Sequence, residues 1–240
     1  MRSWHAEYVA GHCNEAQSAY WKPKAPEELY EIDKDVFEIT NLAADAAEAE
    51  RMKRMRAVLR EEMLAARDTA FIPEGMYERL AGKGTLYEYA QSPAYPLERL
   101  IDLANAACSR DVAQLPRLQE GLSDANPLLR YWAATGCLVL QDKAAPAKEA
   151  LQLLLKDEVA DVRVVAAESL AWLGEKDAAL AVLKEVANKG SSYEALAALN
   201  SIDFLHESRR ISLEEARSAV RNLNMKEPND RIPRYLLSNP

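Results

Sequence analysis

A pattern repeated at an interval of 33 residues constrains the fold of this chain more than any other feature. The stretches DANPLLRYWAATGCLVL (residues 124–140) and DEVADVRVVAAESLAWLG (residues 157–174) align when Arg130 is placed on Arg163. The same offset places an aspartate on an aspartate at the start of each copy and a pair of alanines on a pair of alanines in the middle. Self-similarity at a fixed period of this size is typical of stacked helical repeats.

The repeat resembles a HEAT-type repeat in its string Asp, Val-Arg, Ala-Ala, Leu, Leu-Gly. Small side chains in the middle of each copy would let neighbouring helices approach closely, while Leu and Val fill the space between them. We therefore expect a mainly α protein built around a HEAT-like α-solenoid, an α-α superhelix, over residues 96–225. The helices expected there are Leu97–Ser109, Gln114–Ser123, Pro127–Leu140, Pro146–Lys156, Asp161–Leu173, Asp177–Asn188, Ser192–Leu205 and a last helix that begins after Ser212.

Three residues of the repeats invite a functional interpretation. Arg163 is expected to form a structural pair with the carboxylate of Asp157 or Asp161. Trp132 and Trp172 are expected to be packing residues, although an exposed tryptophan on the inner face of an array would be an anchor for a partner.

The N-terminal quarter is organised differently. The alternation of apolar and polar residues in Leu29–Ile32 predicts one short strand, and residues 45–68 predict a long helix with an apolar stripe. The stripe consists of Met52, Met55, Leu59, Met63 and Ala66. The expected division is a segment 1–76, an irregular connector 77–95, the repeats 96–225 and a tail 226–240 that is a strap or a loose end.

The stretch PEELYEIDKDVFEITNLA, residues 26–43, resembles the C-terminal region of the sulfatase family. Leu29-Tyr30-Glu31-Ile32 matches the first part of the family's string, Asp35 and Glu38 match its middle, and Asn41-Leu42 match its end. Val36 stands where the family usually has proline. The resemblance covers about residues 12–76. With its helical repeats, the chain is similar to bacterial sulfatases that carry such repeats after the catalytic region.

The resemblance does not include the family's catalytic machinery. Its formylglycine nucleophile is made from the cysteine of a Cys-X-Pro-Ser-Arg or Cys-X-Ala-Ser-Arg motif, which none of Cys13, Cys108 and Cys137 begins. The carboxylates that hold the family's divalent cation, Ca²⁺ or Mg²⁺, belong to regions before the matched part. Sulfate ester hydrolysis needs an activated nucleophile and a cation. We therefore predict no catalytic, cofactor-binding or metal-ligating residue in this chain and expect it to be inactive as it stands.

Other classes of site are weakly indicated. Some HEAT-type enzymes bind two irons through repeated His-Glu pairs, but this chain has one such pair, His206-Glu207, and three histidines. The cysteines have no zinc-binding spacing, and Cys137 is expected to be a buried small apolar residue.

The composition narrows the choice of partners. The formal net charge of −8 argues against a broad nucleic-acid surface, which needs clustered Lys and Arg. No apolar run approaches the length that spans a bilayer, so no membrane contact is expected. The first residues lack the apolar core of a secretory signal, and a cytoplasmic location is the expectation for the sequence as written, although the sulfatase family is usually exported.

Two readings of function remain open. The first is a non-catalytic C-terminal portion of a sulfatase-like protein, whose repeats pack on an adjacent sulfatase catalytic region or bind a protein partner. The second is a free-standing HEAT-repeat scaffold that binds a protein partner. A complete sulfuric ester hydrolase is disfavoured because the nucleophile is missing.

Overall fold

The computed structural model describes residues 1–223 and 231–238 and is mainly helical, with no strand among the described residues. The chain divides into two compact units, Met1–Met63 and Leu64–Pro240, each of which is described by itself. None of the described helices combines the length and the apolar character that crossing a membrane requires.

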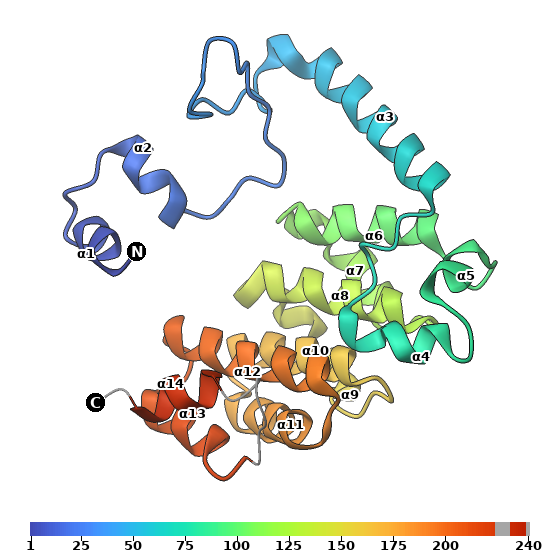
Figure 1. Cartoon of the computed structure of the whole chain (residues 1–240), viewed down its shortest axis with the longest axis vertical. Helices are drawn as coiled ribbons and strands as arrows, with labels where there is room; N and C mark the ends of the chain where they lie inside the picture. The colour runs from blue at the N-terminus through green and yellow to red at the C-terminus, as the bar shows by residue number, and fades with distance from the viewer. Residues whose placement is uncertain (224–230, 239–240) are drawn as a thin grey trace. The chain divides into compact units, whose positions relative to one another are not determined.

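The described chain consists of α-helices, short 3₁₀ segments and the loops that connect them (Figure 1). The α-helices are α1 (Arg2–Val9), α2 (Glu15–Ser18), α3 (Ala49–Ala66), α4 (Tyr77–Ala81), α5 (Leu86–Gln91), α6 (Leu97–Cys108), α7 (Leu115–Gly121), α8 (Pro127–Leu140), α9 (Lys148–Leu154), α10 (Ala160–Trp172), α11 (Lys176–Lys189), α12 (Ser192–Glu207), α13 (Leu213–Val220) and α14 (Arg231–Ser238). The 3₁₀ segments are η1 (Ala19–Trp21), η2 (Ala46–Glu48), η3 (Glu74–Met76), η4 (Val112–Gln114) and η5 (Gln141–Ala147).

The helix ends in the repeats follow from local capping. The side-chain oxygen of Asn126 accepts a hydrogen bond from the amide of Leu128 at 2.9 Å, and Pro127 is the first residue of α8. Asparagine at the cap and proline at the first helical position are favoured because the first amides of a helix have no partner within it. Gly174, with φ of +88°, follows α10 at the position predicted for its end.

The repeats pack in succession within the second unit. Helices α6, α8, α10 and α12 lie against one another in that order, and α7, α9 and α11 each contact the helix that follows in the chain. The middle of each repeat supplies the small side chains at these contacts, and Ala133, Ala134, Ala166 and Ala167 are fully buried. The predicted role of the paired alanines is therefore confirmed by their burial.

Gly136 lies at one of the closest approaches between the helices. A β-carbon at Gly136 in α8 would lie 2.5 Å from Cδ2 of Leu118 in α7 and 3.1 Å from the backbone of Ala107 in α6. No side chain fits there without moving both helices, because interiors are close-packed.

Asp157 joins two successive repeats. Arg130, from the preceding repeat, donates from Nε to its Oδ2 at 2.7 Å and from Nη2 to its Oδ1 at 3.0 Å. Asp157 Oδ1 also accepts a hydrogen bond from the amide of Val159 just before α10, and the backbone oxygen of Asp157 accepts one from Arg163 Nη1 at 3.1 Å. The side chains of Arg130 and Asp157 are only 12% and 5% exposed, so the pair lies inside the protein.

The same arrangement occurs one repeat earlier. Asp124 Oδ1 accepts from the amide of Asn126 at 2.8 Å, its backbone oxygen accepts from Arg130 Nη1 at 2.9 Å, and its Oδ2 accepts from Arg99. The side chain of the repeated aspartate thus bonds the amide of the residue just before the next helix and receives the arginine of the preceding repeat, and its backbone oxygen holds the arginine of its own repeat. The expected carboxylate partner of Arg163 was wrong, because the carboxylate of Asp157 is already occupied by Arg130.

The third repeat departs from the pattern for a visible reason. Glu194 stands where the two earlier copies have arginine, and its carboxylate accepts a hydrogen bond from the amide of Ser191 at 2.7 Å. Ser191 and Glu194 together form a capping box at the start of α12.

Residues 77–95 are helical rather than irregular. Helices α4 and α5 occupy most of this stretch, with Gly82 turning the chain between them at φ of +57°. Thr85 and Glu88 form a capping box at the start of α5, a signal that the sequence contained and that the expectation of an irregular connector missed. The limits predicted for the domains stay predictions.

Part of the predicted tail is also helical. Helix α14 ends the described chain, and Leu236 within it is 1% exposed in a cluster with residues of α12 and α13. Arg217 Nε of α13 donates to the backbone oxygen of Leu236 at 2.9 Å. The expectation of a loose end is therefore wrong for residues 231–238, which pack on α12 and α13, and the remaining tail residues 226–230 and 239–240 lie outside the described part.

The first unit contains no strand at Leu29–Ile32, where one was predicted. The amide of Leu29 donates to Oδ1 of Asn41 at 2.9 Å, and Nδ2 of Asn41 donates to the backbone oxygen of Glu27 at 3.0 Å. The side chain of Asn41 thus takes the place that a neighbouring strand would need. Glu27 is held in turn by Arg56 of α3, whose Nε lies 2.6 Å from its carboxylate.

The apolar stripe of the long helix is only partly buried. Met52 of α3 is 6% exposed, whereas Met55 and Leu59 are 53% and 56% exposed. Exposed apolar side chains also occur in the stretch that resembles sulfatases, where Val36 and Phe37 are 74% and 83% exposed. The stripe is thus buried at Met52 and exposed at Met55 and Leu59.

The buried link between repeats gives a stability prediction. Arg130→Met is expected to lower the free energy of unfolding by about 3–5 kcal/mol, because the carboxylate of Asp157 would stay buried without its cation. Urea unfolding of both proteins measures the difference. The control is Arg117→Met, since Arg117 and Asp102 form an exposed pair 3.8 Å apart, and its loss should change stability by about 1 kcal/mol or less. Equal effects of the two changes would contradict the structural role of Asp157.

Candidate functional site

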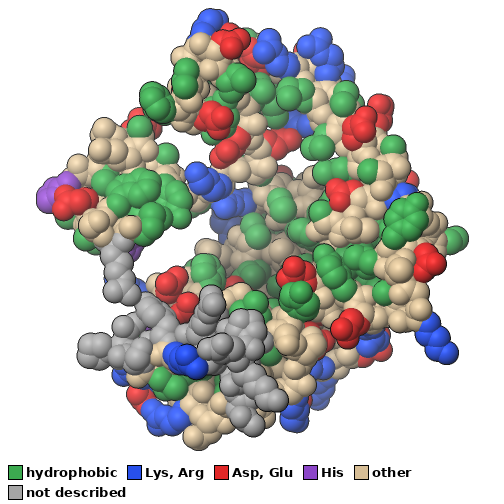
Figure 2. Space-filling model, in the orientation of Figure 1, with side chains coloured by type: hydrophobic (Ala, Val, Ile, Leu, Met, Phe, Trp, Pro, Cys, Tyr) green, Lys and Arg blue, Asp and Glu red, His purple; other side chains and the backbone are tan. Residues whose placement is uncertain are grey.

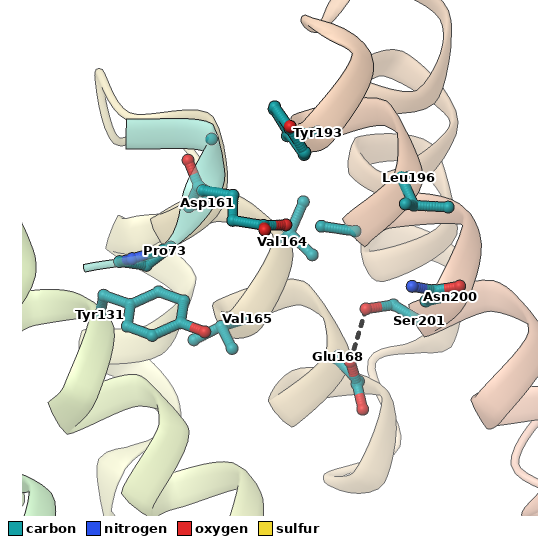
Figure 3. Close-up of a pocket in the computed structure, with 13 residues that line it drawn as sticks. Pro73, Tyr131, Asp161, Val164, Val165, Glu168, Tyr193, Leu196, Asn200 and Ser201 are labelled. Carbon is teal, nitrogen blue, oxygen red and sulfur yellow. Dashed lines mark hydrogen bonds between the residues drawn. The ribbon is translucent and has the colours of Figure 1, made fainter. Parts of the chain in front are cut away.

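A pocket of about 300 Å³ opens between helices of successive repeats, next to the segment that contains η3 (Figure 3). Helix α8 contributes Tyr131, and the other residues come from α10, α12 and the segment 73–75. We call it the Asp161 pocket. Its lining residues are Pro73, Glu74, Gly75, Tyr131, Asp161, Val164, Val165, Glu168, Tyr193, Leu196, Ala197, Asn200 and Ser201.

The segment beside the pocket is held on the repeats by Trp132. The indole Nε1 of Trp132 in α8 donates to the backbone oxygen of Phe71 at 2.9 Å, and the two rings meet edge to face with centroids 6.0 Å apart. Met76 at the end of η3 is fully buried, and η3 contacts both α10 and α12. Trp132 is therefore a packing residue, as expected, and it helps to position one side of the pocket.

Asp161 is the chemically unusual residue of the pocket. It lies in the first turn of α10, is 5% exposed, and its Oδ2 has no hydrogen-bond partner among the described residues. Burial raises the pKa of its carboxyl to about 6, and the negative charge of Glu194 adds to the rise. A buried carboxylate without a partner is costly, so this group either takes up a proton or requires a positive charge.

Gly75 covers the carboxylate of Asp161 closely. A β-carbon at Gly75 would lie 2.4 Å from Oδ1 and 2.6 Å from Oδ2 of Asp161. Glycine at this position is what allows the backbone of the segment 73–75 to approach the carboxylate.

The second acid of α10 is engaged by α12. Ser201 Oγ donates to Oε2 of Glu168 at 2.5 Å, shown as the dashed line in Figure 3. Burial raises the pKa of Glu168, and the hydrogen bond from Ser201 opposes this. Burial also raises the pKa of the Tyr131 hydroxyl, with further contributions from the charges of Asp161 and Glu168. The two acids thus differ in that Glu168 has a donor and Oδ2 of Asp161 has none.

Apolar side chains complete the pocket. Val164 and Val165 of α10 and Leu196 of α12 lie around it in Figure 3. Tyr193, in the first turn of α12, is 53% exposed. An apolar pocket with a few polar groups and an exposed aromatic side chain is the usual composition of a site that binds a ligand or a partner side chain.

The described residues offer no group of three or more His, Cys, Asp or Glu side chains that could hold a metal ion.

From the sequence, Asp161 was expected only as a partner for Arg163, and Glu168 was not singled out. Arg163 instead donates to the backbone of Asp157. A signal was present, because residues seven positions apart lie on the same face of a helix. Two acids at that spacing in the otherwise apolar middle of the repeat mark a polar site on a buried face.

The other residues singled out in the sequence lie outside this pocket. Cys137 is fully buried in α8, and burial raises the pKa of its thiol to about 12, as expected of a packing residue. Trp172 packs beneath the guanidinium of Arg210, whose Cζ lies 3.8 Å from the ring centroid. His206 in α12 has a buried Nδ1 without a hydrogen-bond partner among the described residues and is not a lining residue of the pocket.

The charge of Asp161 leads to a pH-dependent stability. Its pKa is about 6 in the folded protein and near 3.8 in the unfolded chain, so the folded state binds more protons between these values. Stability is therefore lost as the pH rises from about 4 through about 6. Asp161→Asn lacks this titration, and its free energy of unfolding relative to the wild type should rise by about 2 kcal/mol between about pH 4 and about pH 7.5.

Chemical unfolding at several pH values measures this change. Any fixed cost of burying the amide of asparagine is the same at each pH. The change with pH in the difference between the two free energies of unfolding therefore reports on the carboxyl of Asp161. The matched control is Asp177→Asn, an exposed aspartate in α11. A difference between the Asp161 variant and wild type that does not change with pH would show that the carboxyl is not buried as described.

Comparison with known families matches residues 115–203 to a model of HEAT repeats. The matched residues span α7 to α12 and include α8, α10 and α12, which contribute residues to the Asp161 pocket. No curated protein and no solved structure matches the chain. None of these comparisons supports the sulfatase resemblance of residues 12–76, and the lining residues from α8, α10 and α12 lie in the part of the chain that is similar to HEAT repeats.

Proposed function

We propose that the repeats form a short HEAT-like α-solenoid that binds a protein partner, with the Asp161 pocket as part of the contact surface. The observation that carries this proposal is the pocket itself, which lies between successive repeats and combines apolar walls, an exposed tyrosine and a buried acid. Stacked repeats commonly present extended surfaces to protein partners, and pockets that accept one side chain contribute most of the affinity.

The surface charge is compatible with a protein partner. Lys and Arg side chains are scattered among acidic and apolar ones on the face shown in Figure 2. The formal net charge of the chain is −8. Nucleic-acid surfaces depend on clustered basic side chains, so this distribution favours a protein partner.

Peptide display tests the proposal directly. A random peptide library is panned on the full chain. The enriched peptides should bind the wild type, and their affinity for Asn200→Trp should be at least tenfold weaker. Asn200 is exposed at the pocket, so a tryptophan there fills the pocket without entering the core. The matched control is Asn188→Trp on the exposed face of α11, which should bind the same peptides as the wild type.

The two variants must first show the same thermal unfolding as the wild type. No enrichment, or peptides that bind Asn200→Trp as well as they bind the wild type, would reject the pocket as a contact surface.

A second candidate function is a non-catalytic part of a sulfatase-like protein that packs on a sulfatase catalytic region. Its support is the sulfatase-like stretch 26–43 and the exposure of Val36, Phe37 and Ile39 within it. Apolar side chains gathered in this way often mark a surface that another polypeptide covers.

Both candidates predict that the purified chain releases no sulfate from an aryl sulfate, with or without Ca²⁺ or Mg²⁺. The reason is that neither an activated nucleophile nor a metal site is expected in it. Measurable, cation-dependent turnover would contradict both.

A further inference from the structure

We propose that the Asp161 pocket takes up the positively charged side chain of a lysine or arginine of the partner, whose ammonium or guanidinium group pairs with Asp161. This inference rests on the proposed function and names the chemistry that its contact surface selects.

The charges around the pocket are of one sign. The described residues that line it include three acids, Glu74, Asp161 and Glu168, and no Lys, Arg or His. Most other buried or half-buried acids of the repeats have a cation or a hydroxyl donor, as Asp157 has Arg130 and Glu168 has Ser201. Oδ2 of Asp161 is the acceptor in this pocket that is buried and without a partner. An incoming cation would supply what the fold leaves out.

The shape and walls suit a basic side chain on an alkyl stem. The pocket holds about 300 Å³, enough for a lysine or arginine side chain with space to spare. Val164, Val165 and Leu196 offer apolar contact for the methylene groups, and Asp161 belongs to the same lining. Tyr193 is partly exposed in the same lining and offers a ring face to a cation.

Titration of the neighbouring groups sets the pH range of binding. The groups that face Asp161 are Glu74 on the segment 73–75, Tyr131 on α8, Glu168 on α10, and Tyr193 and Glu194 on α12. None of them is cationic. Burial and the charge of Glu194 raise the pKa of Asp161 to about 6, so a cation and a proton compete for the same carboxylate. Binding should therefore be strongest above about pH 7 and weaken as the pH falls below about 6.

The test uses small probes on the full chain, with the methyl groups of Val164 and Val165 as NMR reporters. n-Butylammonium and n-butylguanidinium reproduce the ends of lysine and arginine, and n-butanol is their neutral control. Saturable shifts of these methyl signals are expected with the two cations. The affinity for n-butanol should be at least tenfold weaker.

Asp161→Asn should weaken binding of both cations at least tenfold, whereas Asp177→Asn should leave it unchanged. Cation binding that survives Asp161→Asn, or that n-butanol matches, would overturn the proposal. The probe measurements do not depend on the result of peptide display. A failure of this inference can therefore be told apart from a failure of the proposed function.

A second comparison assigns the source of the cation. A capped tripeptide Gly-Lys-Gly should bind at least as tightly as 1,4-diaminobutane, because the pocket is proposed to serve a protein side chain. Tighter binding of the free diamine would overturn that assignment and make the pocket a site for a small soluble cation.

Discussion

The buried contact between Arg130 and Asp157 is the interaction on which the geometry of the repeats depends. Its two hydrogen bonds of 2.7 and 3.0 Å join side chains that water barely reaches. Asp157 Oδ1 also bonds the amide of Val159 just before α10, and the backbone oxygen of Asp157 holds Arg163, so this one residue ties the start of α10 to α8. Asp124 repeats this arrangement one repeat earlier, which is why the spacing of 33 residues appears both in the sequence and in the packing.

The pocket opens between the repeats that this contact joins. Asp161 lies four residues after Asp157, in the first turn of α10, and it lines the pocket. The two aspartates, one just before the helix and one in its first turn, have opposite situations. Asp157 has its cation within the fold, whereas Oδ2 of Asp161 has no partner among the described residues. The presence or absence of a partner within the fold thus distinguishes the charge of Asp157, which is structural, from that of Asp161, for which we propose a role in binding.

The sequence predicted the repeats well and the site poorly, for physical reasons. Helix α8 was predicted with its limits because proline, asparagine and an apolar stripe act locally. The strand at Leu29–Ile32 was wrong because the side chain of Asn41, twelve residues away, takes its hydrogen bonds. Asp161 could not be recognised as unpartnered from its own surroundings, since that depends on Gly75, which is remote in sequence and comes within contact distance only in the fold.

The most direct test of this account is the titration of the Asp161 carboxyl itself, followed by the chemical shift of its ¹³Cγ in the full chain. The account predicts a midpoint near 6 in the free protein, and a lower midpoint when a saturating alkylammonium probe holds the carboxylate. A midpoint near 4 that the probe does not change would mean that water already satisfies this group, and the pocket would then have no charge to offer a partner.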